Sequence, residues 1–303
     1  MAILYTKKSS QRRKKSKARP LVFMLLAVFA CTLYLLFFKW HNTNEAATYA
    51  GTNNQSQSIP KIIPKLHTDE VLQSQIDSWA AGQPSNFSIN VRELNGDLRT
   101  ASYQPERSMV TASTYKVFVA YAALHSIEQG KYTLNSKTRT GQSIETCLNK
   151  MIINSDNDCG RAIGFLLGWS SINDLVHQQG FVHTELNNYI EGNDSPVGEK
   201  YTTANDEADL LYGLYSGKLL NKSNADLLFS LMKQQVWGER IAAGLPVGIE
   251  AATKPGWLSG VQNDMGIVYG TNSTYIIVIL SDGNNTTPLA QLSKLVYDYL
   301  NGS

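Results

Sequence analysis

Ser113 and Lys116 combine a nucleophile and a base at a spacing of three, at the start of a long apolar run. Residues three apart share one face of a helix, so the hydroxyl and the amine lie side by side in its first turn. Burial lowers the pKa of a lysine because it disfavours the charged form, and an uncharged amine can accept the proton of an attacking serine. The helix N-terminus also stabilises negative charge that develops nearby. The pair therefore indicates acyl transfer through a serine ester.

This spacing alone is a weak signal, because it also occurs at Ser58/Lys61 and Ser230/Lys233. Two further patterns follow Ser113 in order, and each occurs once. Ser155-Asp156-Asn157 falls in a polar turn expected between two helices, and Lys254-Pro255-Gly256 is expected to end a strand. Taken singly, these are a helix cap, a turn and a solvated strand end, but together they favour one active site.

The elements expected to position these groups alternate between strands and helices. Strands at Phe87–Leu94 and Leu98–Gln104 flank Asn95-Gly96-Asp97, which is typical of a hairpin turn. Residues Ser113–Gln129 are apolar nearly all round and end at Gly130, which predicts a buried central helix. Shorter helices are expected at Ile144–Asn154, Cys159–Gly168, Ile172–Gln179 and Asn205–Gly213, in a largely helical middle that extends to about Gln235.

The two ends of this region complete the expected architecture. Strands are predicted near Glu250–Lys254, Asp264–Tyr269 and Tyr275–Ser281, with a helix after about Thr68 and another from Pro288. This pattern predicts an α+β fold: an antiparallel sheet flanked by the terminal helices, plus an all-helical lobe. Active sites tend to lie where such lobes meet.

With these motifs in order, the chain resembles the class A β-lactamases and the related penicillin-recognising serine hydrolases, whose elements are S-x-x-K, S-D-N and K-T-G. The resemblance covers about residues 68–302. Supporting stretches include Met109-Val110-Thr111-Ala112, Glu185-Leu186-Asn187, Thr202-Thr203 and Gly244-Leu245-Pro246.

The resemblance implies a role for each matching residue. Four are expected to be catalytic: Ser113 as the acylated nucleophile, Lys116 as its base, Ser155 as a proton relay toward the leaving nitrogen, and Lys254 as a positive charge for the substrate carboxylate. Three are expected to bind substrate: Asn157 through an amide, Gly256 by letting the strand approach, and Trp257 through its backbone N–H, which would complete an oxyanion hole with that of Ser113.

The sequence departs from the family pattern at several places, among them the deacylation loop and the K-T-G element. His183 stands where class A enzymes carry the glutamate that activates the deacylating water, although Glu185 and Asn187 match the neighbouring positions of that loop. His183 is then either a replacement base of near-neutral pKa or a surface residue. Pro255 replaces the hydroxyl residue between Lys254 and Gly256, which removes a hydrogen bond to a substrate carboxylate.

Two cysteines, Cys147 and Cys159, lie close together in the presumed outer domain. In an oxidising compartment they would form a disulfide, and the alternative is a pair of buried thiols. No metal-ligand spacing surrounds them, and neither a metal nor an organic cofactor is expected.

The first sixty residues predict export and anchoring. A basic tail at residues 1–20 precedes an uncharged apolar run of 18 residues, Leu21–Phe38, which is long enough to cross a membrane. Residues 39–66 read as a flexible linker, and residues 67–303 as the hydrolase domain. The prediction is a single transmembrane helix with the N-terminus cytoplasmic and the domain outside; the alternative is a cleaved signal peptide.

Charge and motifs together limit the partners. After residue 40 the chain carries 18 Lys and Arg against 25 Asp and Glu, and this acidic balance argues against nucleic acid. The expected partner is a β-lactam or a peptidoglycan peptide, bound by a monomer that contacts the membrane through its N-terminal helix. Two alternatives remain: a D-alanyl-D-alanine carboxypeptidase or transpeptidase, and a non-catalytic cell-wall-binding module with the same fold.

Overall fold

The structure is a computed structural model that describes residues 65–186 and 199–302. The basic tail, the predicted transmembrane segment Leu21–Phe38 and most of the predicted linker lie outside the described residues, and so does Asn187. Among the residues that are described, no helix combines the length and the apolar character needed to span a membrane. The predicted anchor and domain boundaries therefore stay predictions.

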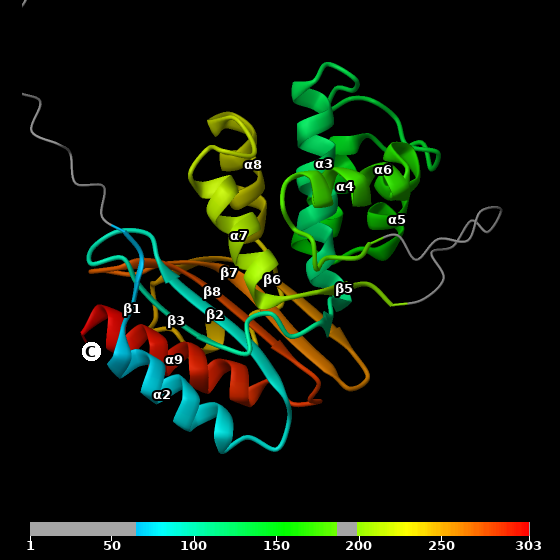
Figure 1. Cartoon of the computed structure of the whole chain (residues 1–303). Coiled ribbons are helices and arrows are strands. Elements are labelled where there is room, and N and C mark those ends of the chain that lie inside the picture. Colours follow the sequence, from blue (N-terminus) through cyan, green and yellow to red (C-terminus); the bar gives the residue numbers. More distant parts are fainter. Residues whose placement is uncertain (1–64, 187–198, 303) are drawn as a thin grey trace, which may run out of the picture. The chain divides into compact units, whose positions relative to one another are not determined.

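A sheet of six strands runs through the middle of the described part of the chain (Figure 1). Its strands, in spatial order, are β1 (His67–Thr68), β3 (Arg99–Tyr103), β2 (Phe87–Glu93), β8 (Thr274–Ser281), β7 (Val261–Tyr269) and β6 (Glu250–Leu258). The pairings from β3 to β6 are antiparallel, but β1 pairs with β3 in parallel. The sheet is thus mixed, which corrects the expected purely antiparallel sheet, because two residues just before the first helix extend its edge.

Two terminal helices cover one face of this sheet, as predicted (Figure 1). Helix α2 (Glu70–Ala81) begins at Asp69, whose carboxylate accepts hydrogen bonds from two backbone N–H groups of the first turn. It buries Leu72 and Ile76 against the sheet, and α9 (Thr287–Asn301) buries Leu292 and Val296 beside them. These apolar stripes form one of the two cores.

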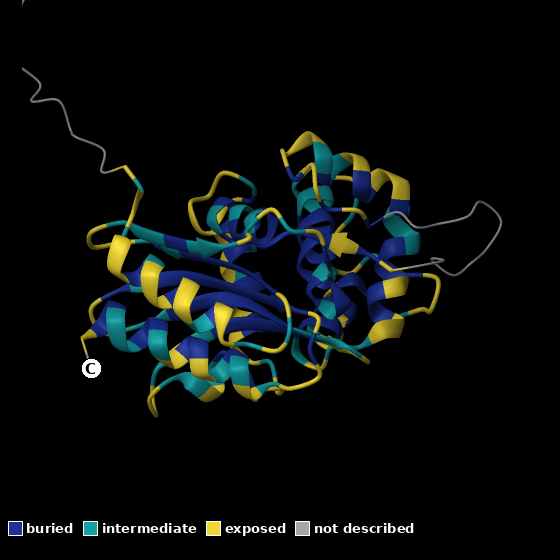
Figure 2. Ribbon diagram, turned by 60° about the horizontal axis from the view of Figure 1, so that its bottom comes forward, coloured by how far each residue is buried: buried dark blue, intermediate teal, exposed yellow. Residues whose placement is uncertain are grey.

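The opposite face of the sheet carries the helical lobe, which surrounds a central helix (Figures 1 and 2). Helix α3 (Tyr115–Glu128) is buried from Lys116 to Leu124, as its all-round apolar sequence predicts. The helices around it are α4 (Ile144–Ile153), α5 (Asn157–Leu167), α6 (Trp169–Gln178), α7 (Ala204–Tyr215) and α8 (Lys222–Lys233). Two short strands, β4 (Met109–Val110) and β5 (Tyr201–Thr202), pair beside the lobe.

The structure confirms the predicted hairpin, because β2 and β3 pair antiparallel across Asn95-Gly96-Asp97. It corrects one boundary: Lys254-Pro255-Gly256 lies inside β6, which continues to Leu258, rather than at the end of a strand. Strand β6 lies at the edge of the sheet. A proline is tolerated in an edge strand because the position without an N–H can face away from the neighbouring strand.

Candidate active site

Ser113 lies in a tight turn between the sheet and the central helix. It belongs to a short 3₁₀ helix, η1 (Ala112–Thr114), that leads directly into α3. Ala112, the residue before it, has φ of +45°, which is sparsely populated for a residue with a side chain. Ser113 lines a cavity of about 310 Å³. The strained residue therefore lies directly before the nucleophile, and the short 3₁₀ helix presents Ser113 to this cavity.

The amine of Lys116 is held by four oxygen atoms around the nucleophile. Its Nζ lies 2.9 Å from Ser113 Oγ, 2.6 Å from the Ser155 carbonyl oxygen, 3.2 Å from Ser155 Oγ and 2.7 Å from Asn157 Oδ1. The carbonyl and amide oxygens can only accept, so they take the two N–H groups of a neutral amine. Its lone pair then remains for a hydroxyl. The contacts therefore suit Lys116 as the acceptor of the Ser113 proton.

Burial prepares this amine for its role. The Lys116 side chain is fully buried, and desolvation lowers its pKa to about 8, although the charge of Asp156 acts in the opposite direction. Lys254 is also fully buried, and burial together with the positive charge of Lys116 lowers its pKa to about 7. Near neutral pH, at least one of the two amines is therefore uncharged in an appreciable fraction of molecules.

Ser155 joins the two lysines. Its hydroxyl lies 3.2 Å from Lys116 Nζ and 3.0 Å from Lys254 Nζ, while Lys254 also donates to the Pro255 carbonyl oxygen at 2.8 Å. Ser155 has φ of +60° in the turn between α4 and α5, so the backbone adopts a costly conformation to aim this side chain. A continuous chain of hydrogen bonds runs from Ser113 through Lys116 and Ser155 to Lys254.

Gly256 allows strand β6 to touch the nucleophile turn. A Cβ atom at this position would lie 2.6 Å from the backbone nitrogen of Ser113 and 2.9 Å from the Thr111 carbonyl oxygen. Asn263 of β7 reinforces the contact, because its Nδ2 donates to the Val110 and Thr111 carbonyl oxygens at 2.7 and 3.1 Å. The strand backbone that carries Trp257 is thus brought beside the Ser113 amide, as an oxyanion hole requires.

Two packed tryptophan rings lie at the β6 side of the cavity. Trp257 lines the cavity, and its ring packs against Trp237, with 5.1 Å between the centroids. The guanidinium of Arg240 lies 5.1 Å from the Trp257 centroid and donates to Gln262 Oε1 at 2.6 Å. Trp237 and Arg240 were not singled out in the sequence, because they lie in an irregular segment without a motif.

Two further titratable residues, Glu199 and Lys200, line the cavity and were also missed. They lie just before β5, and the Thr111 backbone N–H donates to the Lys200 carbonyl oxygen at 2.8 Å, which ties this segment to the nucleophile turn. The Glu199 carboxylate accepts a hydrogen bond from the Tyr201 hydroxyl at 3.0 Å. Nothing in their spacing from Ser113 could have indicated this proximity, since the contact is tertiary.

A buried carboxyl group lies beneath the nucleophile turn. Glu207 of α7 is fully buried and shares a hydrogen bond with the Thr114 hydroxyl, and desolvation raises its pKa to about 8. Asp264 of β7 is buried as well, and desolvation raises its pKa to about 7. Both carboxyl groups are therefore largely or partly protonated near neutral pH.

The predicted deacylation loop is only partly brought to the site. The side chain of His183 is 54% exposed, its Nε2 lies 3.7 Å from Glu106 Oε2, and it is not among the described residues that line the Ser113 cavity. Glu185 faces the helical lobe, where its carboxylate lies 3.4 Å from His177 Nε2. Asn187 lies outside the described residues. Of the two interpretations of His183, this geometry favours the surface residue.

Cys147 and Cys159, which the sequence left open between a disulfide and two buried thiols, are free thiols in the structure. Both are buried where α4 packs against α5, and Cys159 Sγ donates to Gln142 Oε1 at 3.8 Å. Burial also raises the pKa of the Cys159 thiol. They pack as small apolar side chains in the core, as in the alternative of two buried thiols.

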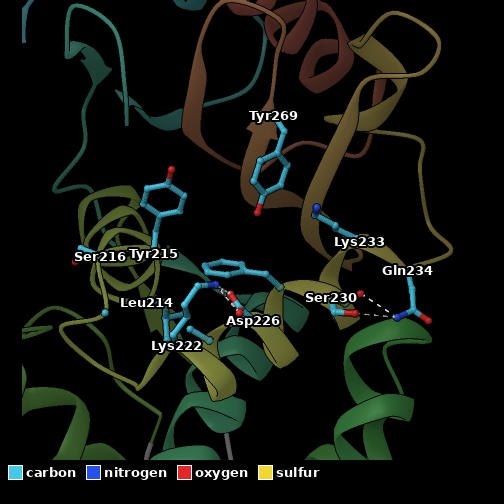
Figure 3. A pocket seen from close by; sticks show the side chains of 12 residues that line it. Leu214, Tyr215, Ser216, Lys222, Asp226, Ser230, Lys233, Gln234 and Tyr269 are labelled. Carbon is cyan, nitrogen blue, oxygen red and sulfur yellow. Dashed lines mark hydrogen bonds and ion pairs between the residues drawn. The ribbon is translucent and has the colours of Figure 1, made fainter.

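The repeated Ser-x-x-Lys spacing at Ser230/Lys233 has no catalytic geometry. These residues line a separate cavity of about 860 Å³ between α7, α8 and β7 (Figure 3). Lys233 Nζ forms an ion pair with Glu250 at 2.8 Å and lies 4.2 Å from the centroid of the Tyr269 ring, while Gln234 donates to Ser230 Oγ. The other pair, Ser58/Lys61, lies outside the described residues.

A buried lysine beside a serine that follows a strained residue, linked to a second serine and a second lysine, defines a serine acyl-transfer site at the junction of a sheet and a helical lobe. The comparisons with known proteins agree with this class. The family model described as the β-lactamase enzyme family matches residues 71–300. The chain therefore belongs to the β-lactamase enzyme family and is a serine β-lactamase-like hydrolase.

Individual relatives support the same assignment. A β-lactamase of Bacillus subtilis (strain 168) is 29% identical over 238 residues, which cover 68% of this chain and 76% of the relative. The extended-spectrum β-lactamase PER-1 of Pseudomonas aeruginosa is 21% identical, covering 76% of this chain and 87% of the relative. A mutant of PBP-A, solved as an acyl-enzyme complex with penicillin G, is similar in fold with a TM-score of 0.73 and 21% identity, covering 80% of this chain and all of PBP-A.

Proposed function

We propose that the chain opens β-lactam amides through an acyl-enzyme on Ser113. The observation that carries the proposal is the placement of Lys116 Nζ, 2.9 Å from Ser113 Oγ, with its two nearest acceptors being oxygens that cannot give up a proton. Lys116 takes the proton of Ser113 as the hydroxyl attacks the carbonyl carbon. The negative charge that develops on the carbonyl oxygen is stabilised by the backbone N–H groups of Ser113 and Trp257.

The proton then moves to the leaving nitrogen through Ser155. Its hydroxyl contacts both Lys116 and Lys254, so it can receive a proton from Lys116 while it donates its own to the nitrogen. The C–N bond breaks as the nitrogen is protonated, which leaves the acyl group on Ser113. Lys254 supplies positive charge for the substrate carboxylate, and the guanidinium of Arg240 lies nearby over the Trp257 ring. Asn157 binds the amide of the acyl side chain.

We further propose that the enzyme is anchored in the cell membrane and acts outside the cytoplasm. The support is in the sequence: eight Lys and Arg residues precede the apolar run Leu21–Phe38. A polar linker then separates this run from the catalytic domain, which suits a monomeric enzyme held near the cell wall.

A second candidate function is that of a D-alanyl-D-alanine carboxypeptidase or transpeptidase acting on peptidoglycan. It is favoured by one observation: the position of the usual deacylating glutamate carries His183, whose side chain is exposed and does not line the Ser113 cavity. An enzyme that forms the acyl-enzyme readily but deacylates slowly with β-lactams would hold penicillin rather than destroy it.

Turnover separates the two functions. The full-length chain is mixed with a tenfold excess of benzylpenicillin, and intact mass and hydrolysed penicillin are measured from seconds to hours. A short-lived adduct with release of many equivalents of penicilloic acid supports the β-lactamase. One persistent adduct per chain supports the peptidoglycan enzyme, and folded protein that never gains the adduct contradicts both.

A further inference from the structure

Lys200 is a buried lysine in the Ser113 cavity, and no carboxylate among the described residues pairs with it. Its side chain has a relative exposure of only 9%, and it lines the cavity together with Ser113, Asn157 and Trp257. No carboxylate of the described residues lies within ion-pair distance of its Nζ, and no acceptor among them takes a hydrogen bond from it. An ammonium group has three N–H donors, and the described residues leave those of Lys200 without an acceptor.

Two aromatic rings fix the position of this ammonium group. Lys200 Nζ lies 4.6 Å from the Trp169 centroid and 5.2 Å from the Tyr115 centroid, and the two rings are 6.1 Å apart. Two glycines of α5 make room for the rings: a Cβ at Gly164 would lie 2.2 Å from Trp169, and one at Gly160 would lie 3.1 Å from the Tyr115 hydroxyl. The ring faces attract a cation but accept no strong hydrogen bond.

The position of Lys200 in the cavity indicates which part of a substrate it would meet. Trp257 and Leu258 of β6 line the cavity on the side where Lys254 receives the common carboxylate of the substrate, while Lys200 belongs to the segment before β5. Tyr115, whose ring contacts Lys200, follows the nucleophile by two residues. Asn157, which the proposed mechanism assigns to the amide of the acyl side chain, lines the same cavity as Lys200, so we take this cavity as the place of the acyl arm.

We infer that Lys200 is a specificity-determining residue, which selects substrates with a carboxylate on the acyl side chain. This inference rests on the proposed acylation of Ser113. A carboxylate in this part of the cavity would accept hydrogen bonds from the Lys200 N–H groups, which have no acceptor among the described residues, and would form an ion pair with this buried charge. Desolvation lowers the pKa of Lys200 to about 8, so most molecules still carry the charge at pH 7.

Benzylpenicillin and carbenicillin form a matched pair of probes, because carbenicillin differs only by a carboxylate in place of a hydrogen on the acyl side chain. The second-order rate constant of acylation is measured with each probe at pH 7 on the full-length chain and on Lys200→Met, which removes the charge but keeps a long side chain. We expect the ratio of the acylation rate constant for carbenicillin to that for benzylpenicillin to fall about tenfold in Lys200→Met, which is equivalent to about 1.4 kcal/mol. Both rates come from the same sample, so loss of folded protein cancels in the ratio.

Two variants complete the test. Lys200→Arg keeps the charge, so its ratio of rate constants should be close to that of wild type. Lys218→Met should leave the ratio unchanged, since Lys218 Nζ lies 5.0 Å from the Tyr212 ring centroid and does not line this cavity. An equal ratio in wild type and Lys200→Met would overturn the inference, and so would an equal loss of rate with both probes. If wild type is acylated by neither probe, the proposed function itself fails, which is a distinguishable result.

Discussion

Gly256 and Ser113 are in such close contact that no other residue type fits at position 256: a Cβ atom there would lie 2.6 Å from the backbone nitrogen of Ser113. The nucleophile comes from the helical lobe, and Gly256 comes from the edge strand of the sheet. The missing side chain therefore determines how closely the two halves of the site approach each other.

Gly256→Ala should lower the acylation rate at least about 10²-fold, because the nucleophile turn must move away from the strand by a substantial fraction of an ångström. The measurement is the rate of benzylpenicillin labelling, alongside the melting temperature. Gly82→Ala is the matched control, since a Cβ at Gly82 would make only ordinary contacts, the nearest at 3.6 Å, at the end of α2. Equal acylation rates in Gly256→Ala and wild type would contradict this contact.

The acylation rate at saturating benzylpenicillin should rise with pH and level off near pH 8. Lys116 acts as a base only when uncharged, and burial lowers its pKa to about 8, so the uncharged fraction increases up to tenfold per pH unit below that value. Rapid-quench mass spectrometry between pH 5.5 and 9.5 gives the profile. Lys116→Ala should be slower by orders of magnitude and should lose this rise. A flat profile in the wild type would show that Lys116 does not lose a proton before the attack.

Ser230→Ala should leave acylation unchanged, although Ser230 and Lys233 have the same spacing as the catalytic pair. Lys233 Nζ pairs with Glu250 at 2.8 Å and also lies near the Tyr269 ring (Figure 3), so it is not available as a base for Ser230. Labelling stoichiometry with benzylpenicillin is the measurement. A loss of label in Ser230→Ala with an unchanged melting temperature would mean that this cavity takes part in the chemistry.

Glu207→Gln should stabilise the folded state relative to wild type increasingly as the pH rises from 5 to 8. The pKa of Glu207 is raised to about 8 in the folded state, whereas an unfolded glutamate ionises near pH 4.3. Between these values the folded protein binds the extra proton, so this group makes stability fall as the pH rises. A glutamine removes the dependence and keeps an oxygen that accepts the hydrogen bond of the Thr114 hydroxyl. The difference in melting temperature between the two proteins is measured at pH 5, 6.5 and 8; a constant difference would contradict the buried carboxylic acid.

His183→Ala should leave the release of the penicilloyl group unchanged. The His183 side chain is exposed beside Glu106 and does not line the Ser113 cavity. Deacylation is followed by the decay of the adduct mass after removal of free penicillin, and Glu106→Ala is the control for a change in the local surface charge. A tenfold slower decay in His183→Ala alone would show that the loop moves His183 to the acyl group.

The residues that meet around Ser113 were predictable because each lies in a short motif whose spacing is local. Ser113 and Lys116 share a helix face, and Ser155 and Asn157 share a turn, so their mutual geometry follows from backbone structure. The order of the motifs then identified the family and its α+β fold. The hairpin and the buried central helix were predictable for the same reason.

What the sequence could not indicate depends on tertiary contacts. Lys200 reaches the cavity only because β5 pairs with β4, and Glu207 resembles an ordinary acidic residue in the first turn of a helix until its burial is known. The sequence left Cys147 and Cys159 open between a disulfide and two buried thiols, because proximity in sequence does not distinguish the two, and the structure has them as free thiols. The edge position of β6 likewise explains why the strand continues through Pro255.

The most direct test of the account is to locate the covalent adduct. The full-length chain is incubated briefly with benzylpenicillin, quenched in acid and digested, and the modified peptide is sequenced by mass spectrometry in wild type and in Ser113→Ala. The account predicts one penicilloyl group, on Ser113, and no adduct in a Ser113→Ala variant that melts at the same temperature as wild type. An adduct on another residue, or folded wild-type protein without any adduct, would contradict the assignment of Ser113 as the nucleophile.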